Sequence, residues 1–117
     1  MTNGTRIKPE MAATIGQWEY LCCECLVNLG SGGCVITGRD CMACDNTNVR
    51  FFHTLEHRED QHLIEVGIEC ARALMEGSEI PALAENETKR KERWRIHYRR
   101  PGRCTTTVDN LIEKGKL

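Results

Sequence analysis

The chain is poor in large apolar side chains and has no long hydrophobic stretch. Its 117 residues include only two Trp, two Tyr and two Phe, so we expect one small domain with a thin apolar core. No segment approaches the roughly 20 apolar residues that a membrane-spanning helix needs. The first ten residues, MTNGTRIKPE, lack the apolar region of a secretory signal. These absences favour a cytoplasmic protein that does not associate with membranes.

Cysteine, by contrast, is abundant. Small domains with little core are often stabilised by disulfides or by a metal. Thiols stay reduced in the cytosol, so clustered cysteines are expected to bind metal, and disulfides are the alternative if a signal peptide has been removed. The eight cysteines are Cys22, Cys23, Cys25, Cys34, Cys41, Cys44, Cys70 and Cys104.

The net charge of −1 hides a strong segregation of charge along the chain. Residues 1–88 carry 6 basic and 14 acidic side chains, whereas residues 89–103 carry 8 basic side chains and one acidic. Such a basic segment indicates either an anionic partner or an internal contact with the acidic remainder of the chain.

Hydrophobic periodicity and turn signals predict an α+β domain in three parts. Residues 1–38 form an N-terminal helical segment, because apolar residues recur at steps of three and four over residues 10–29. A strand is expected over residues 34–37. Residues 39–80 form a zinc knuckle, a hairpin with strands over 49–57 and 62–66, and a helix over 68–76. Residues 81–117 form a basic helix from Pro81 toward Tyr98, a strand over 104–108 and a short helix capped by Asp109.

Two C-x2-C pairs, Cys22/Cys25 and Cys41/Cys44, lie 15 residues apart and match a four-cysteine zinc spacing. A C-x2-C turn aims two thiolates at one ion. On a helix over 10–29, however, Cys22 and Cys25 fall on the apolar face, where cysteine packs as a small hydrophobe. A second metal site formed by Cys22, Cys25 and Cys34 stays open.

Better partners for Cys41 and Cys44 lie downstream. Cys70 falls near the start of a helix, where the helix dipole favours a thiolate. Knuckle, hairpin and then a ligand in the first helical turn is the order of a treble-clef or zinc-ribbon-like finger. The hairpin offers His53 and His57, which are about 13 Å apart on one strand and so do not share an ion. We expect His57 to be the fourth zinc ligand, with His53 as its alternative.

These motifs resemble a family of small, uncharacterised bacterial zinc-finger proteins. The resemblance rests on three segments of this chain: the C-x2-C of Cys41/Cys44, the H-x3-H of His53/His57, and Glu65-Val66-Gly67-Ile68-Glu69-Cys70-Ala71. It covers roughly residues 41–100 and includes a basic, tryptophan-containing continuation. It implies a zinc-binding fold, and the family supplies no catalytic activity that can be assigned to this chain.

Two enzymatic interpretations compete with a structural zinc site. His53, Glu56 and His57 spell H-x-x-E-H, the inverted zincin motif of metallohydrolases, which requires residues 51–60 to be helical. Alternatively, Cys41/Cys44 is a thioredoxin-like redox pair, although no βαβ pattern surrounds it. We identify no small-molecule substrate.

The basic segment interleaves arginines with aromatic side chains, a pattern that suits phosphate contact and base stacking. The alternative is a solvated helix that lies against the acidic remainder with its aromatics packed inward. We therefore expect a structural Zn²⁺ bound by Cys41, Cys44, His57 and Cys70, whose removal by a chelator unfolds the domain. The expected contacts to nucleic acid or an acidic protein are Lys89, Arg90, Arg93, Trp94, Arg95 and Arg99.

Overall fold

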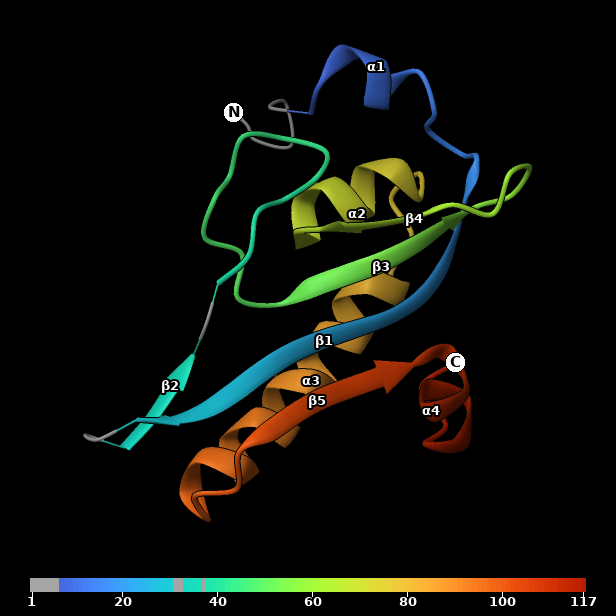
Figure 1. Ribbon diagram of the computed structural model, residues 1–117. Helices are drawn as coiled ribbons and strands as arrows, with labels where there is room; N and C mark the ends of the chain where they lie inside the picture. The colour runs from blue at the N-terminus through green and yellow to red at the C-terminus, as the bar shows by residue number, and fades with distance from the viewer. Residues whose placement is uncertain (1–6, 31–32, 37) are drawn as a thin grey trace.

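The computed structural model describes residues 7–30, 33–36 and 38–117. It confirms the expected α+β class, because an antiparallel sheet packs against helices (Figure 1). In chain order, the elements are α1 (Pro9–Ala12), β1 (Trp18–Gly30), β2 (Gly33–Ile36), β3 (Phe52–His57), β4 (Leu63–Val66), α2 (Ile68–Leu74), α3 (Ile80–His97), β5 (Gly102–Thr107) and α4 (Val108–Glu113).

The long strand β1 is the centre of a five-stranded antiparallel sheet. Residues 22–24 of β1 pair with both β3 and β5, so these two strands lie on opposite edges of β1. Further along β1, β2 pairs with residues 27–30, and β4 pairs with the free edge of β3. Strands from the N-terminal, central and C-terminal parts of the chain therefore belong to one sheet.

The helix expected over residues 10–29 is wrong, because only Pro9–Ala12 is helical and β1 begins at Trp18. The strand contains an irregularity: Tyr20 pairs with Leu55 and Cys22 with Thr54, which leaves Leu21 as an extra residue. Such a bulge shifts the alternation of side chains between the two faces. Buried positions therefore fall at 18 and 20 and then at 23, 25 and 27, which hides the period of two expected for a strand.

The other expected elements are confirmed with small changes in their ends. The hairpin forms as β3 and β4, the helix after Gly67 as α2, the basic helix as α3 and the strand near Cys104 as β5. The strand expected over residues 34–37 is β2, although Thr37 itself lies outside the described residues. Asp109 does not cap the last helix. Thr107 does so, because its hydroxyl accepts a hydrogen bond from Asn110 N while the Asn110 side chain accepts one from Thr107 N.

Helix α3 lies across one face of the sheet (Figure 1) and contacts both β1 and β5. The buried residues of α3 are mainly polar: Pro81, Ala84, Glu87, Thr88 and Glu92. The apolar core lies between the sheet and the helices α2, α3 and α4, and includes Trp18, Phe52, Leu55, Leu74 and Leu111. No helix in the described part of the chain has the length and apolar character needed to cross a membrane.

Candidate metal centre and basic groove

Three of the four predicted zinc ligands come together. Cys41 and Cys44 lie on the loop between β2 and β3, and Cys70 lies in the first turn of α2. The Sγ atoms of the three residues are all within 4.8 Å of one another. Tetrahedral zinc with Zn–S bonds of about 2.3 Å separates its sulfurs by about 3.8 Å. These cysteines are therefore placed to bind a metal ion.

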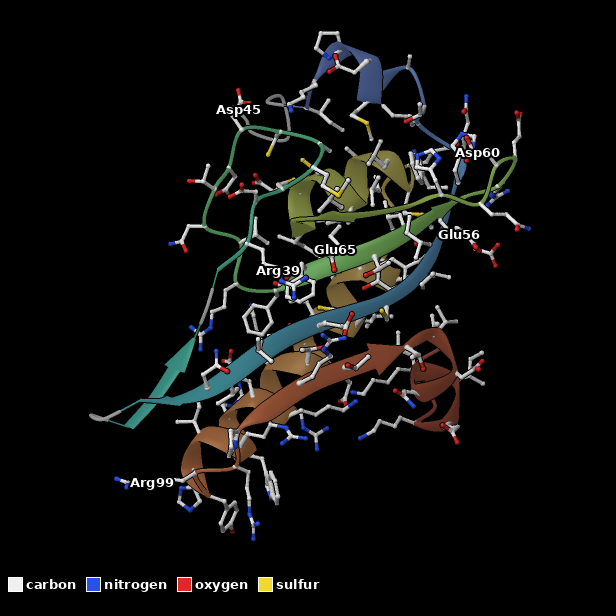
Figure 2. The ribbon with its side chains drawn as sticks, viewed as in Figure 1. Arg39, Asp45, Glu56, Asp60, Glu65 and Arg99 are labelled. Atoms are coloured by element: carbon white, nitrogen blue, oxygen red, sulfur yellow. The ribbon has the colours of Figure 1, made fainter. Side chains whose placement is uncertain are left out.

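The loop of residues 38–51, which we call the cysteine loop, is held against the hairpin by backbone hydrogen bonds. Cys41 N donates to Asn46 O at 2.9 Å, which closes the turn, and Met42 N donates to Glu65 O on β4 at 3.0 Å. An isolated bridge between Arg39 and Val49 closes the base of the loop. In Figure 2, Arg39 and Glu65 point toward each other, and their ion pair measures 2.9 Å. The loop thus has defined contacts although it contains no helix or strand.

The surroundings of Cys41 favour its thiolate, which is the form that binds metal. A hydrogen bond from the Cys70 thiol and backbone N–H groups, among them Gly67 N at 3.4 Å, lower the pKa of Cys41 to about 5, although burial acts in the opposite direction. The same shared proton raises the pKa of Cys70. These contacts therefore favour a thiolate at Cys41, and a metal ion would take the place of the shared proton.

His57 does not join the three cysteines. It is the last residue of β3, it pairs with Trp18, and one of its ring nitrogens, Nε2, lies 2.9 Å from Gln17 Oε1. Its neighbours are Asp60 and His62, which with His57 form a separate group at the hairpin turn. Figure 2 shows Asp60 on the opposite side of the molecule from Asp45, which belongs to the cysteine loop. Because His57 is at the far end of its strand, the prediction that it completes this centre is corrected.

The alternative ligand, His53, lies in a third group. Its ring nitrogen Nε2 faces Cys23 of β1 and Glu85 of α3, and the three ligand atoms are within 4.8 Å of one another. In the described ranges 7–30, 33–36 and 38–117, no group unites either histidine with the three cysteines. Sequence reasoning missed the group around His53, because its members have no recognisable spacing. Cys23 meets His53 only through pairing of β1 with β3, and Glu85 reaches them only because α3 packs on the sheet.

The structure also tests the other predictions made from the spacing of cysteines and histidines. Cys22 and Cys25 are three residues apart on a strand, so their side chains point to opposite faces and do not chelate one ion. Cys25 instead packs against Cys104 in a small apolar cluster. The side chain of Cys34 lies outside the described residues. His53 and His57 belong to a strand rather than a helix, so the geometry that the inverted zincin motif requires is absent from this segment.

A basic groove lies where α3, β5 and the end of α4 meet. The groove has a volume of about 560 Å³, and its cationic lining residues are Arg90, Lys91, Arg95, Arg103 and Lys114, with Glu87 as the one acidic residue among those that line it. Trp94 also lines the groove and is 55% exposed. Its ring centroid is 5.1 Å from that of Tyr98, which is 57% exposed. The aromatics of the basic helix therefore face solvent rather than the core.

Several cations of the groove are fixed by contacts within the protein. Arg95 donates to Pro101 O at 3.1 Å, Lys91 donates to Thr105 O, and Arg103 pairs with Glu24 at 3.2 Å. Arg90 pairs with Glu87 at 2.9 Å. Such contacts position the charges in advance, which lowers the ordering cost of binding an anion.

The predicted contact residues divide into two sets. Arg90, Trp94 and Arg95 line the groove. Lys89 pairs with Glu85 at 3.3 Å, and Arg93 and Arg99 are exposed outside the groove. Figure 2 shows Arg99 at the C-terminal end of α3. Sequence reasoning did not assign Lys91, Arg103 and Lys114, because β5 and α4 bring two of them to the groove from beyond the helix.

Comparisons with protein-family models, with curated proteins and with solved structures find no match to this chain. The metal centre and the basic groove are therefore the features of this chain that indicate a function.

Proposed function

We propose that this protein is a metal-stabilised binding module whose basic groove binds single-stranded nucleic acid. Zn²⁺ at Cys41, Cys44 and Cys70 would hold the cysteine loop, the β3–β4 hairpin and α2 together in a treble-clef-like unit. Its role is structural, and the protein is not an enzyme under this proposal. The observation that carries the nucleic-acid assignment is the exposed Trp94 in a groove with five cations.

The donor set supports zinc as the ion. Soft thiolate ligands favour Zn²⁺ over Mg²⁺, Ca²⁺ or Mn²⁺, which prefer oxygen. Three sulfurs leave one tetrahedral position for a ligand outside this cysteine group. The knuckle, hairpin and helix follow one another in the order of a treble clef, and Cys70 occupies the first turn of α2.

The ion pairs of the basic segment and the exposure of its aromatic side chains support nucleic-acid binding over a purely internal role for this segment. The alternative of a basic helix lying against the acidic remainder accounts for little of the charge. Glu24 of β1 pairs with Arg103, whereas Lys89 and Arg90 pair with Glu85 and Glu87 of α3 itself. This alternative does not account for Trp94 and Tyr98, which would pack inward but are exposed. A base stacked on an aromatic ring contributes about 1–3 kcal/mol without regard to sequence, so an exposed ring beside phosphate-binding cations suits a single strand.

Fluorescence anisotropy with labelled single-stranded DNA and RNA of mixed sequence tests this proposal. If three or four groove cations contact phosphates, the logarithm of the binding constant should fall with the logarithm of salt concentration with a slope of about −2 to −3. Arg90→Ala should weaken binding and make this slope shallower. Arg58→Ala is the matched control, because Arg58 is an exposed arginine at the β3–β4 turn and its replacement should change neither quantity.

Competition with polyglutamate separates nucleic acid from an acidic protein partner. We expect nucleic acid to displace polyglutamate but not the reverse at equal charge concentration. Equal competition would assign the groove to acidic proteins, and no binding of either polymer at low salt would refute the role of the groove.

A further inference from the structure

A second group of ligating side chains lies inside the protein, between the sheet and α3. Cys23 of β1 and His53 of β3 are register partners, and Glu85 of α3 faces them. His53 Nε2 lies 3.0 Å from Glu85 Oε1 and 3.9 Å from Cys23 Sγ. A tetrahedral zinc ion with these ligand types separates its ligand atoms by about 3.3–3.6 Å. Both distances differ from this range by about 0.3 Å.

The burial of this group sets it apart from a surface cluster. Cys23 and His53 are fully buried, at 0% exposure, and the Glu85 side chain is 13% exposed. With Zn²⁺, one thiolate, one carboxylate and a neutral imidazole give an assembly with no net charge, which a buried site favours.

His53 also has the hydrogen bond that metal-binding histidines typically make through their other ring nitrogen. Its second ring nitrogen, Nδ1, lies 2.7 Å from Tyr20 Oη, and Tyr20 is itself buried. Metal-binding histidines nearly always hydrogen-bond through the nitrogen that does not face the ion, and this contact fixes the ring orientation. In the metal-bound form, Nδ1–H would donate to the tyrosine oxygen and the lone pair of Nε2 would face the ion.

We propose that Cys23, His53 and Glu85 form a second metal site, which takes a single Zn²⁺ or a similar borderline-soft divalent cation. A water molecule or another donor would complete its coordination. The site is independent of the three-cysteine centre, because the two groups share no ligand. Its ligands come from β1, β3 and α3, so the ion would fasten the helix that carries the basic groove to the sheet.

Cobalt titration of the full chain, after chelation, tests the second site. The wild-type protein should bind two equivalents of Co²⁺. The thiolate-to-cobalt charge-transfer absorption from the one-thiolate site should be about one third of that from the three-thiolate centre. Cys23→Ala and His53→Gln should each bind one equivalent and retain only the three-thiolate spectrum. Cys25→Ala is the control, because Cys25 is another buried cysteine on the same face of β1, and it should still bind two.

The outcomes separate this inference from the proposed function. One equivalent in the wild type, unchanged in Cys23→Ala and lost in Cys70→Ser, would overturn the second site and leave the three-cysteine centre in place. One equivalent that persists in Cys70→Ser and disappears in Cys23→Ala would support the second site and remove the first. If Cys23→Ala does not fold, Cys70→Ser decides: cobalt that remains bound in Cys70→Ser supports the second site, and one wild-type equivalent that is lost in Cys70→Ser contradicts it.

Discussion

Removal of the metal from the three-cysteine centre should release the cysteine loop before it releases the sheet. Within residues 38–51 the structure has only the isolated bridge between Arg39 and Val49 as regular pairing. Three residues of this loop, Cys41, Ala43 and Val49, are buried in the main apolar core. Most of that core belongs to the sheet, α2 and α4. The sequence predicts global unfolding in chelator, whereas the structure favours local opening.

The size of the effect follows from binding linkage. An ion that binds only the closed loop stabilises it by about 4 kcal/mol when free metal is 1,000-fold above the dissociation constant. Without metal, the closed loop retains the burial of Val49, worth about 1.5–3 kcal/mol, and a smaller amount from Ala43. Amide protection in the loop should therefore fall by about 1,000-fold on chelation, while the amides of β1 keep their protection.

Hydrogen–deuterium exchange followed by mass spectrometry measures this difference. Peptides covering residues 38–51 should exchange faster in chelator, and peptides covering residues 18–27 should not change. Cys70→Ser should behave like the chelated wild-type protein and respond no further to chelator. Cys104→Ala is the control, since this buried cysteine lies outside every candidate metal group of the described residues. Equal acceleration in all peptides, or none in any, would refute the reasoning.

Three further outcomes are expected. Trp94→Ala should weaken single-strand binding by about 1–3 kcal/mol in anisotropy, whereas Trp94→Phe keeps a stacking face and should lose less. Thr88→Val should lower the free energy of unfolding in urea by about 1–3 kcal/mol, because the buried Thr88 hydroxyl bonds Thr106 Oγ1 and Ala84 O, both at 2.9 Å; Thr88→Ser should cost less. Burial raises the pKa of Glu85, but the hydrogen bond and charge of His53, together with Lys89, lower it overall. In metal-free protein its stabilisation is thus complete above the unfolded-state pKa of about 4.3 and is lost as pH falls through the lower folded-state value. The urea midpoints of wild type and Glu85→Gln should converge on acidification.

Elements with local start and stop signals were predictable. The ends of these elements are marked by the residue types next to them in the chain. The signals are Gly67 before α2, Pro81 in the first turn of α3, and the charged turn between β3 and β4. The strand β1 was not predictable in this way. Its bulge at Leu21 shifts the buried face by one residue, from Trp18 and Tyr20 to Cys23 and Cys25, so the strand shows no continuous period of two. The spacing of Trp18, Cys22 and Cys25 imitates a helix, although Cys22 and Cys25 lie on opposite faces of the strand.

The same distinction between local sequence signals and strand pairing decides which metal ligands could be predicted. Cys41 and Cys44 share one turn, and Cys70 follows Gly67, whose N–H reaches Cys41 Sγ at 3.4 Å, so short-range motifs were sufficient to predict this group. The position of a histidine depends instead on strand register. His53 pairs with Val66 and Cys23, while His57 pairs with Trp18 at the other end of β3. Without β1 as a strand, no sequence argument brings Cys23 to His53.

Helix α3 contributes side chains both to the buried group of Cys23, His53 and Glu85 and to the basic groove, from two different sides of the helix. Glu85 and Thr88 face the sheet, whereas Arg90 and Trp94 line the groove. Glu85 and Trp94 are nine residues apart, which is about 13 Å along a helix. An ion that fixes Glu85 to Cys23 and His53 would restrict the motion of this helix and so reduce the ordering cost of anion binding at Trp94. Loss of nucleic-acid affinity in Cys23→Ala, with the groove residues unchanged, is therefore the expected sign that the two sites are coupled.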